Sequence, residues 1–173
     1  MFPNLFKPLW SVQPVPEPAP IYTQLRNRIL SLTPAEIGIK CTAQLPNVWG
    51  ILMEMGLPNG VAALVCLAEG TTSLYYGSGG GILGCGSLEN VAKASRAFMV
   101  VAEGSSQLME TTNVFPLTRI SKVRFYVLTF AGALTCEVDG AVLNRGKHAL
   151  SRLFFYGQEV ITQIRLQQEQ KKN

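Results

Sequence analysis

The residues whose spacing most resembles a chemical motif are the glycines of segment 79–84, which reads GGGILG. This segment satisfies the GxGxxG pattern of dinucleotide-binding loops, in which glycines let the backbone approach a pyrophosphate closely. It also stands between an expected strand and an expected helix, as that motif requires. Gly79, Gly81 and Gly84 are therefore the candidate cofactor-binding residues.

The surroundings of this segment argue against a nucleotide. The expected helix is capped only at Ser87, so a pyrophosphate held by the glycines would not lie at the helix N-terminus. No lysine or arginine occurs between Lys40 and Lys93, so a phosphate would lack a local cation. No acidic residue ends a second parallel strand, where a ribose would be held. We therefore predict a glycine-rich strand or bulge, and no bound cofactor.

Residue types that carry out acid–base or nucleophilic catalysis are sparse. His148 is the single histidine, and no serine lies in a GxSxG elbow that would make it a nucleophile. Glu137 and Asp139 form the one close pair of carboxylates, and alternation along a strand places both on one face. We interpret His148 as a surface residue and the two carboxylates as a solvated strand end. The sequence thus predicts a protein that is not an enzyme.

The cysteines do not form a metal motif. The four of them are far apart in apolar or glycine-rich settings, without a CxxC pair: Cys41, Cys66, Cys85 and Cys136. We predict reduced cysteines of the core, no metal site and a cytoplasmic protein.

Basic residues are locally in excess over residues 119–152, where only Glu137 and Asp139 oppose them. They are candidates for docking an acidic protein partner, and the alternative is a solvated rim of the sheet. Nucleic acid is not expected, because no basic helix is present and aromatic residues do not alternate with the cations. The candidate partner-binding residues are Arg119, Lys122, Arg124, Arg145, Lys147 and Arg152.

The elements that must position these residues follow a proline-rich arm over residues 1–20, which holds six of the ten prolines. Proline removes a hydrogen-bond donor, so the arm cannot enter the sheet interior, and we predict that folding does not need it. It either lies along an apolar groove or is disordered. A single domain over 21–168 and a polar tail over 169–173 complete the chain.

Hydrophobic periodicity gives the helices and strands. Helices are expected over 22–32, from a capped start at 33–36, over 48–55 after Asn47, over 88–108 after Ser87, and over 148–168. Strands are expected over 61–68, 73–76, 114–117, 123–130 and 133–138. Hairpins separated by single helices predict an α+β fold with an antiparallel sheet of about five strands.

Composition indicates one domain with apolar surface to spare. The chain has 173 residues, 47% of them hydrophobic and 15% charged, which is fewer charges than usual. Strand 123–130 is apolar on both sides, so both faces need cover. No apolar run reaches the ~20 residues of a membrane span. A homodimer is therefore expected.

Four segments in this order resemble the roadblock / dynein light-chain superfamily, which has a profilin-like fold. They are the hairpin VAALVCLAEGTTSLYYGSGGG, the helix SLENVAKASRAFMVVAEGSSQLM, the hairpin VRFYVLTFAGALTCEV and the helix HALSRLFFYGQEVITQIRL. The resemblance rests on element order, and no functional residue is carried over. It implies a non-catalytic homodimer that acts as a platform for small Ras-like GTPases or motor assemblies.

The function predicted from the sequence is therefore a non-enzymatic, dimeric scaffold or regulatory protein-interaction module. The alternative is a sensor that binds a small ligand through the glycine-rich segment 77–84.

Overall fold

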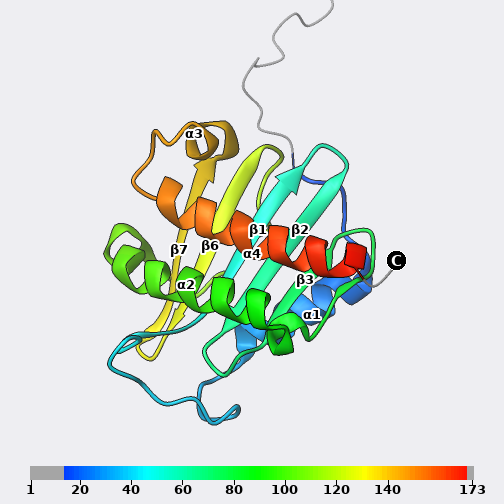
Figure 1. The fold of residues 1–173 in the computed structure, drawn as a ribbon. Coiled ribbons are helices and arrows are strands. Elements are labelled where there is room, and N and C mark those ends of the chain that lie inside the picture. Colours follow the sequence, from blue (N-terminus) through cyan, green and yellow to red (C-terminus); the bar gives the residue numbers. More distant parts are fainter. Residues whose placement is uncertain (1–13, 171–173) are drawn as a thin grey trace, which may run out of the picture.

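The computed structural model describes residues 14–170 and shows an α+β fold in three layers (Figure 1). Within this range an antiparallel sheet of seven strands has the order β4-β3-β2-β1-β6-β7-β5. The strands are β1 (Val48–Leu57), β2 (Gly60–Leu67), β3 (Thr72–Tyr76), β4 (Gly81–Ile82), β5 (Glu110–Thr112), β6 (Lys122–Thr129) and β7 (Gly132–Asp139). The helices are α1 (Pro20–Ser31), α2 (Glu89–Ser105), α3 (Gly140–Asn144) and α4 (Ser151–Gln170).

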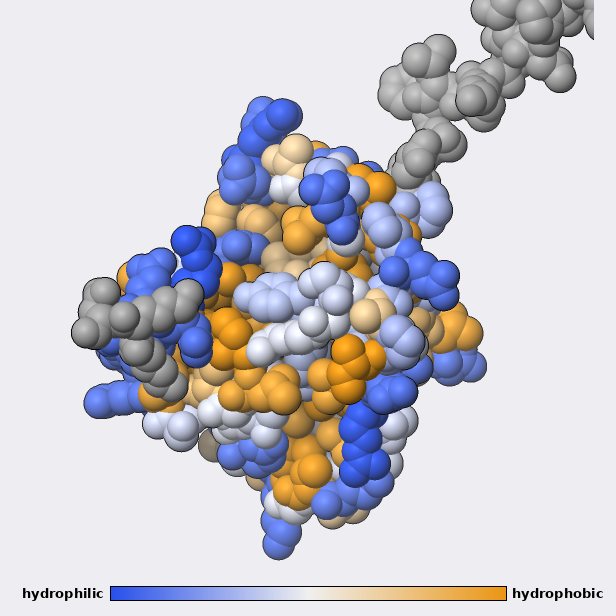
Figure 2. Space-filling view, turned by 90° about the vertical axis from the view of Figure 1, so that its right-hand side faces the viewer, coloured by the Kyte–Doolittle hydropathy of each residue, from blue (hydrophilic) through white to orange (hydrophobic). Residues whose placement is uncertain are grey.

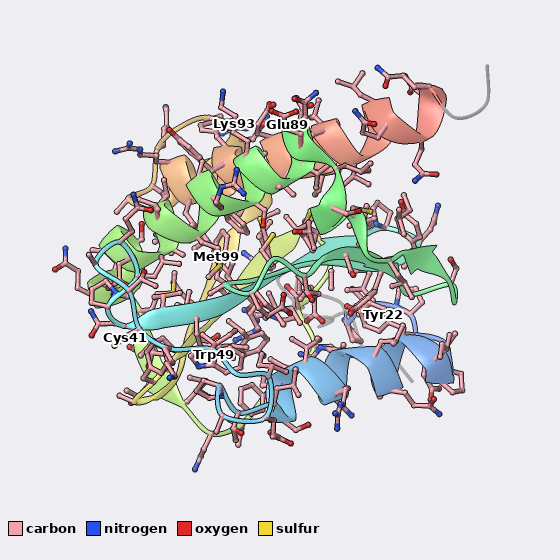
Figure 3. The ribbon with its side chains drawn as sticks, turned by 60° about the horizontal axis from the view of Figure 1, so that its bottom comes forward. Tyr22, Cys41, Trp49, Glu89, Lys93 and Met99 are labelled. Carbon is pink, nitrogen blue, oxygen red and sulfur yellow. The ribbon has the colours of Figure 1, made fainter. Side chains whose placement is uncertain are left out.

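The chain's own helices cover both faces of the sheet, so the apolar strand over 123–130 does not by itself call for a dimer. Helices α2 and α4 lie side by side on one face and α1 lies on the other, so that Met99 is above the sheet and Trp49 below it (Figure 3). On β1 and β6, Met53 and Phe125 face α2 and α4, whereas Leu52 and Tyr126 face α1. We call these two sides the α2/α4 face and the α1 face.

The expected helix over 48–55 is wrong, because these residues form the central strand β1. The strand is apolar on both sides, and a short continuous apolar run does not distinguish a buried strand from a buried helix. Pro58 and Asn59 make a two-residue turn to β2, with Leu57 opposite Gly60, so the residues interpreted as a helix stop belong to a hairpin. This strand and the short edge strands raise the count from about five to seven.

The expected edge strand over 114–117 is also wrong, since the strand that pairs with β7 is β5 at Glu110–Thr112. Two carbonyl groups of the following segment, at Phe115 and Pro116, instead accept hydrogen bonds from the buried Arg26 side chain at 3.0 Å. The buried Arg26 side chain therefore satisfies carbonyl groups that a neighbouring strand would otherwise bond.

The remaining elements largely agree with the hydrophobic periodicity. Helices α1, α2 and α4 and strands β2, β3, β6 and β7 lie close to the expected ranges. The helix expected to start at Thr33 is only a turn that ends at Gly38. Its capping contact is nevertheless present, since the Thr33 N–H donates to Glu36 at 2.7 Å. Ser87 lies in a 3-10 turn over Cys85–Ser87 and does not cap α2. Helix α3 was not expected.

The proline-rich arm meets the domain on the α1 face. Residues 1–13, which carry most of the arm, lie outside the described residues. Val15 is buried against the α1 face, and the N–H of Ala19 donates to the carbonyl of Gly77 at 2.7 Å. Pro20, expected as the end of the arm, begins α1, where proline suits the first turn. The last part of the arm is therefore part of the folded domain.

Candidate functional site

The glycine-rich segment forms one edge of the sheet. Tyr76 donates its backbone N–H to Gly80 at 3.0 Å, and Ile82 stands opposite Leu74. Because bonded and non-bonded pairs alternate in an antiparallel ladder, the N–H and C=O groups of Gly81 point away from β3. Among residues 14–170 no further strand pairs with β4, so the backbone groups of Gly81 lie at an open edge of the sheet.

Glycine is required here for close packing of the backbone. A Cβ added to Gly81 would lie 2.5 Å from the carbonyl oxygen of Leu74, so any side chain would separate β4 from β3. Gly79 has a φ of 90° in the β3–β4 turn and packs against Ala19, and Gly84 has a φ of 67° before the 3-10 turn. The prediction of a glycine-rich strand with close backbone approach is confirmed.

This edge is uncharged and apolar. From Gly70 to Leu88 the chain carries no charged side chain. Exposed hydrophobic side chains surround the edge: Leu83 is 59% exposed, Ile21 of α1 46% and Tyr76 37%. Figure 2 views the molecule from this side and shows hydrophobic patches mixed with near-neutral residues in the middle of the face. Natural proteins usually protect such edges with charges, so an unprotected one is a candidate interface.

The basic candidates do not form one surface of free cations. Arg119 and Arg124 contact Glu137 at 2.6 and 3.2 Å, and Lys122 contacts Asp139 at 3.2 Å. Arg152 stacks over the Tyr156 ring with 5.7 Å to its centre. Among residues 14–170 the candidates that remain exposed without an ion pair lie near the start of α4: Arg145, Lys147 and Arg152.

Glu137 is not the solvated strand end that its position suggested, because its side chain is only 8% exposed. Burial opposes its ionisation, but the hydrogen bonds of Arg119 and the charge of Arg124 outweigh burial and lower the pKa of this carboxyl. Asp139 is 40% exposed and accepts the N–H of Ala141 as the cap of α3. Both carboxylates are thus engaged in structural contacts.

His148 has a structural role in the turn before α4. Its Nδ1 accepts the backbone N–H of Leu150 at 3.1 Å, and its own N–H donates to the Ser151 hydroxyl at 3.1 Å. Cys66 and Cys85 are buried, Cys136 is half-buried and Cys41 is exposed, so the expectation of core cysteines fails for Cys41. Within the described part of the chain no cluster of metal-ligating side chains occurs, and no helix there is long and apolar enough to cross a bilayer.

Sequence reasoning missed a buried polar cluster around Glu54 on the α1 face. Glu54 is fully buried and accepts hydrogen bonds from Tyr22 at 2.7 Å, from Arg26 at 2.6 Å and from the Thr118 N–H at 2.8 Å. The same row continues across the sheet, since Arg124 lies opposite Glu54 and Glu137 lies opposite Arg124. The one sequence signal for this cluster was Glu54, a lone carboxylate inside the apolar run 48–57. Its meaning was missed because that run was interpreted as a helix.

Comparison with known proteins gives no relative from which to transfer a role: no protein-family model, curated protein or solved structure matches this chain.

Proposed function

We propose that this chain is a non-enzymatic homodimer that serves as a protein-interaction module in the cytoplasm. The observation that carries the proposal is the β4 edge, which combines an open strand edge of the described sheet with no charge and exposed hydrophobic side chains. Two copies pair antiparallel along β4, because an edge without charges meets its own copy without repulsion between like charges. The seam then joins two seven-stranded sheets into one.

The partner surface of this dimer is the exposed basic group at the start of α4. Arg145, Lys147 and Arg152 are exposed and carry no opposing carboxylate among the described ion pairs. An acidic protein surface is the chemistry that suits them, and such rim charges act mainly on the association rate. The resemblance to roadblock proteins supports a small GTPase or a motor assembly as the class of partner.

Sedimentation velocity at tens of micromolar tests the dimer. The wild-type chain should sediment as a dimer, and Leu83→Lys should shift it to a monomer because a charge at the seam opposes pairing. Val114→Lys is the matched control, since Val114 is 64% exposed but lies outside the β4 edge. A monomeric wild type, or a Leu83→Lys variant that stays dimeric, would rule out this seam.

A further inference from the structure

A groove that lies apart from the β4 edge separates α2 from the long connection between α1 and β1. Its volume is about 470 Å³, within the range of about 300–1,000 Å³ typical of ligand pockets. One wall is a stripe of α2 with Ala92, Ser95, Met99 and Val100 at helical spacing, and the other wall carries Ile39 and Leu45. The groove is therefore mostly apolar along its length.

Ser95 of the groove lining belongs to a buried cluster that is polar but uncharged. Ser95 is only 4% exposed and accepts a hydrogen bond at 3.0 Å from Thr72, which is fully buried. Burial raises the pKa of Cys66 to about 12, so this thiol is neutral at physiological pH, and it contacts both hydroxyl groups. Such a buried hydroxyl can position a ligand without imposing a charge.

The connection over residues 32–47 carries the second wall of the groove, where Ile39 and Leu45 pack against the two core clusters. The Ile39 N–H donates to the Pro34 carbonyl at 2.9 Å, and Asn47 donates to Glu103 of α2 at 2.6 Å. Between these anchors residues 40–44 are exposed, and the segment projects from the lower end of the molecule in Figure 1. A connection of this length without helix or strand is uncommon unless it has a function.

Two cations stand at the rim. Lys40 of the connection and Arg96 of α2 both line the groove, and neither forms an ion pair within residues 14–170. The one acidic residue of the lining, Glu69, accepts the N–H of Thr71 at 2.6 Å. The rim therefore carries net positive charge beside an apolar wall.

We propose that this groove is a binding site for a small amphipathic organic anion, whose apolar body lies along the α2 stripe and whose anionic group meets Lys40 and Arg96. An apolar ligand alone would leave the two cations at the rim without a counter-charge. A compact inorganic anion would leave the apolar wall unused. The site would give the protein a ligand-binding function independent of the dimer seam.

Two fluorescent probes test the shape and the charge of the site separately. 8-Anilinonaphthalene-1-sulfonate is an amphipathic anion, and N-phenyl-1-naphthylamine is the same molecule without its sulfonate. Ala92→Phe fills the groove and should weaken sulfonate binding by about tenfold or more. Ala97→Phe is the matched control, because Ala97 lies on α2 but lines the separate groove between α2 and α4.

Charge reversal provides the second arm. Arg96→Glu should weaken binding of the sulfonate probe several-fold and leave the affinity for the neutral probe within about twofold of wild type. Lys93→Glu reverses a charge on the outer side of the same helix, beside Glu89 (Figure 3), and should change neither probe. Arg96 is exposed, so its substitution tests the binding site even where Ala92→Phe lowers stability.

The proposal is overturned by any of three results. The first is an absence of binding of the sulfonate probe to the wild type. The second is a greater loss of affinity for that probe in Ala97→Phe than in Ala92→Phe. The third is an equal loss of affinity for both probes in Arg96→Glu. Sedimentation of the same variants separates this proposal from the dimer, since none of these residues lies at β4.

Discussion

At the scale of single residues, the most consequential contact is the buried ion pair between Arg26 and Glu54. The two side chains are 4% and 0% exposed, and they join α1 to the central strand. A buried pair of this kind adds little stability over a well-packed apolar pair, but removal of one partner leaves an uncompensated charge. Its value here is to fix where α1 and the segment after β5 lie.

We therefore expect Glu54→Leu to lower the free energy of unfolding by about 3–5 kcal/mol. The double variant Arg26→Met/Glu54→Leu should be more stable than Glu54→Leu alone, because it removes both charges. Urea unfolding followed by circular dichroism measures both. A Glu54→Leu variant within about 1 kcal/mol of wild type would contradict the structural role of the pair.

Tyr22 gives this cluster a dependence on alkaline pH. Burial, followed by the neighbouring Glu54 carboxylate, raises the pKa of Tyr22 above its ordinary value of 10.0. Above that pH the unfolded chain loses the proton while the folded chain keeps it, so stability falls as the pH rises. In Tyr22→Phe the slope of unfolding free energy against pH should be shallower above pH 10, by up to about 1.4 kcal/mol per pH unit. Identical slopes in the two proteins would show that Tyr22 ionises equally in both states.

At the scale of elements, glycines decide how closely backbones approach. A Cβ added to Gly56 at the end of β1 would lie 1.9 Å from the carbonyl oxygen of Arg119, whereas one added to Gly104 in α2 would meet nothing within 4 Å. Gly56→Ala should therefore destabilise the fold by about 1–3 kcal/mol or more. Gly104→Ala should stabilise it by about 0.5–1 kcal/mol, because alanine is the better helix former. Thermal unfolding of the two variants measures the difference, and a shift of both in the same direction would be inconsistent with this packing.

The sequence predicted elements well wherever the pattern was local. Helices α2 and α4 and the hairpin of β6 and β7 follow from periodicity and turn residues. It failed at β1, because an apolar run buried on both faces has no distinct period, and at 114–117, because the Arg26 side chain comes from the distant α1. Long-range partners of this kind are not encoded in the spacing of neighbouring residues.

The candidate site was predictable only in part for the same reason. The glycine cluster at 77–84 and its lack of cations were visible in the sequence, and they indicated a strand rather than a nucleotide loop. The ion pairs that occupy Arg119, Lys122 and Arg124 were not, because their partners Glu137 and Asp139 lie on the neighbouring strand β7.

At the scale of the whole molecule, the two sheet edges differ. The edge at β7 carries the short strand β5 and, beside it, ionised side chains including Glu137. The edge at β4 carries no charged side chain, and the exposed apolar side chains of Ile21, Tyr76 and Leu83 surround it. This asymmetry gives the molecule one face suited to pairing with a copy of itself.

Amide hydrogen exchange at this edge tests the pairing of β4 most directly. The N–H of Gly81 points away from β3 and meets no further strand in the described part of the chain, so it should exchange rapidly at low protein concentration. In the proposed dimer it would donate to the second copy, and its exchange should then slow as the concentration rises through the range of dimer formation. Fast exchange of Gly81 at every concentration, in a chain that sedimentation shows to be dimeric, would place the seam elsewhere and contradict the account.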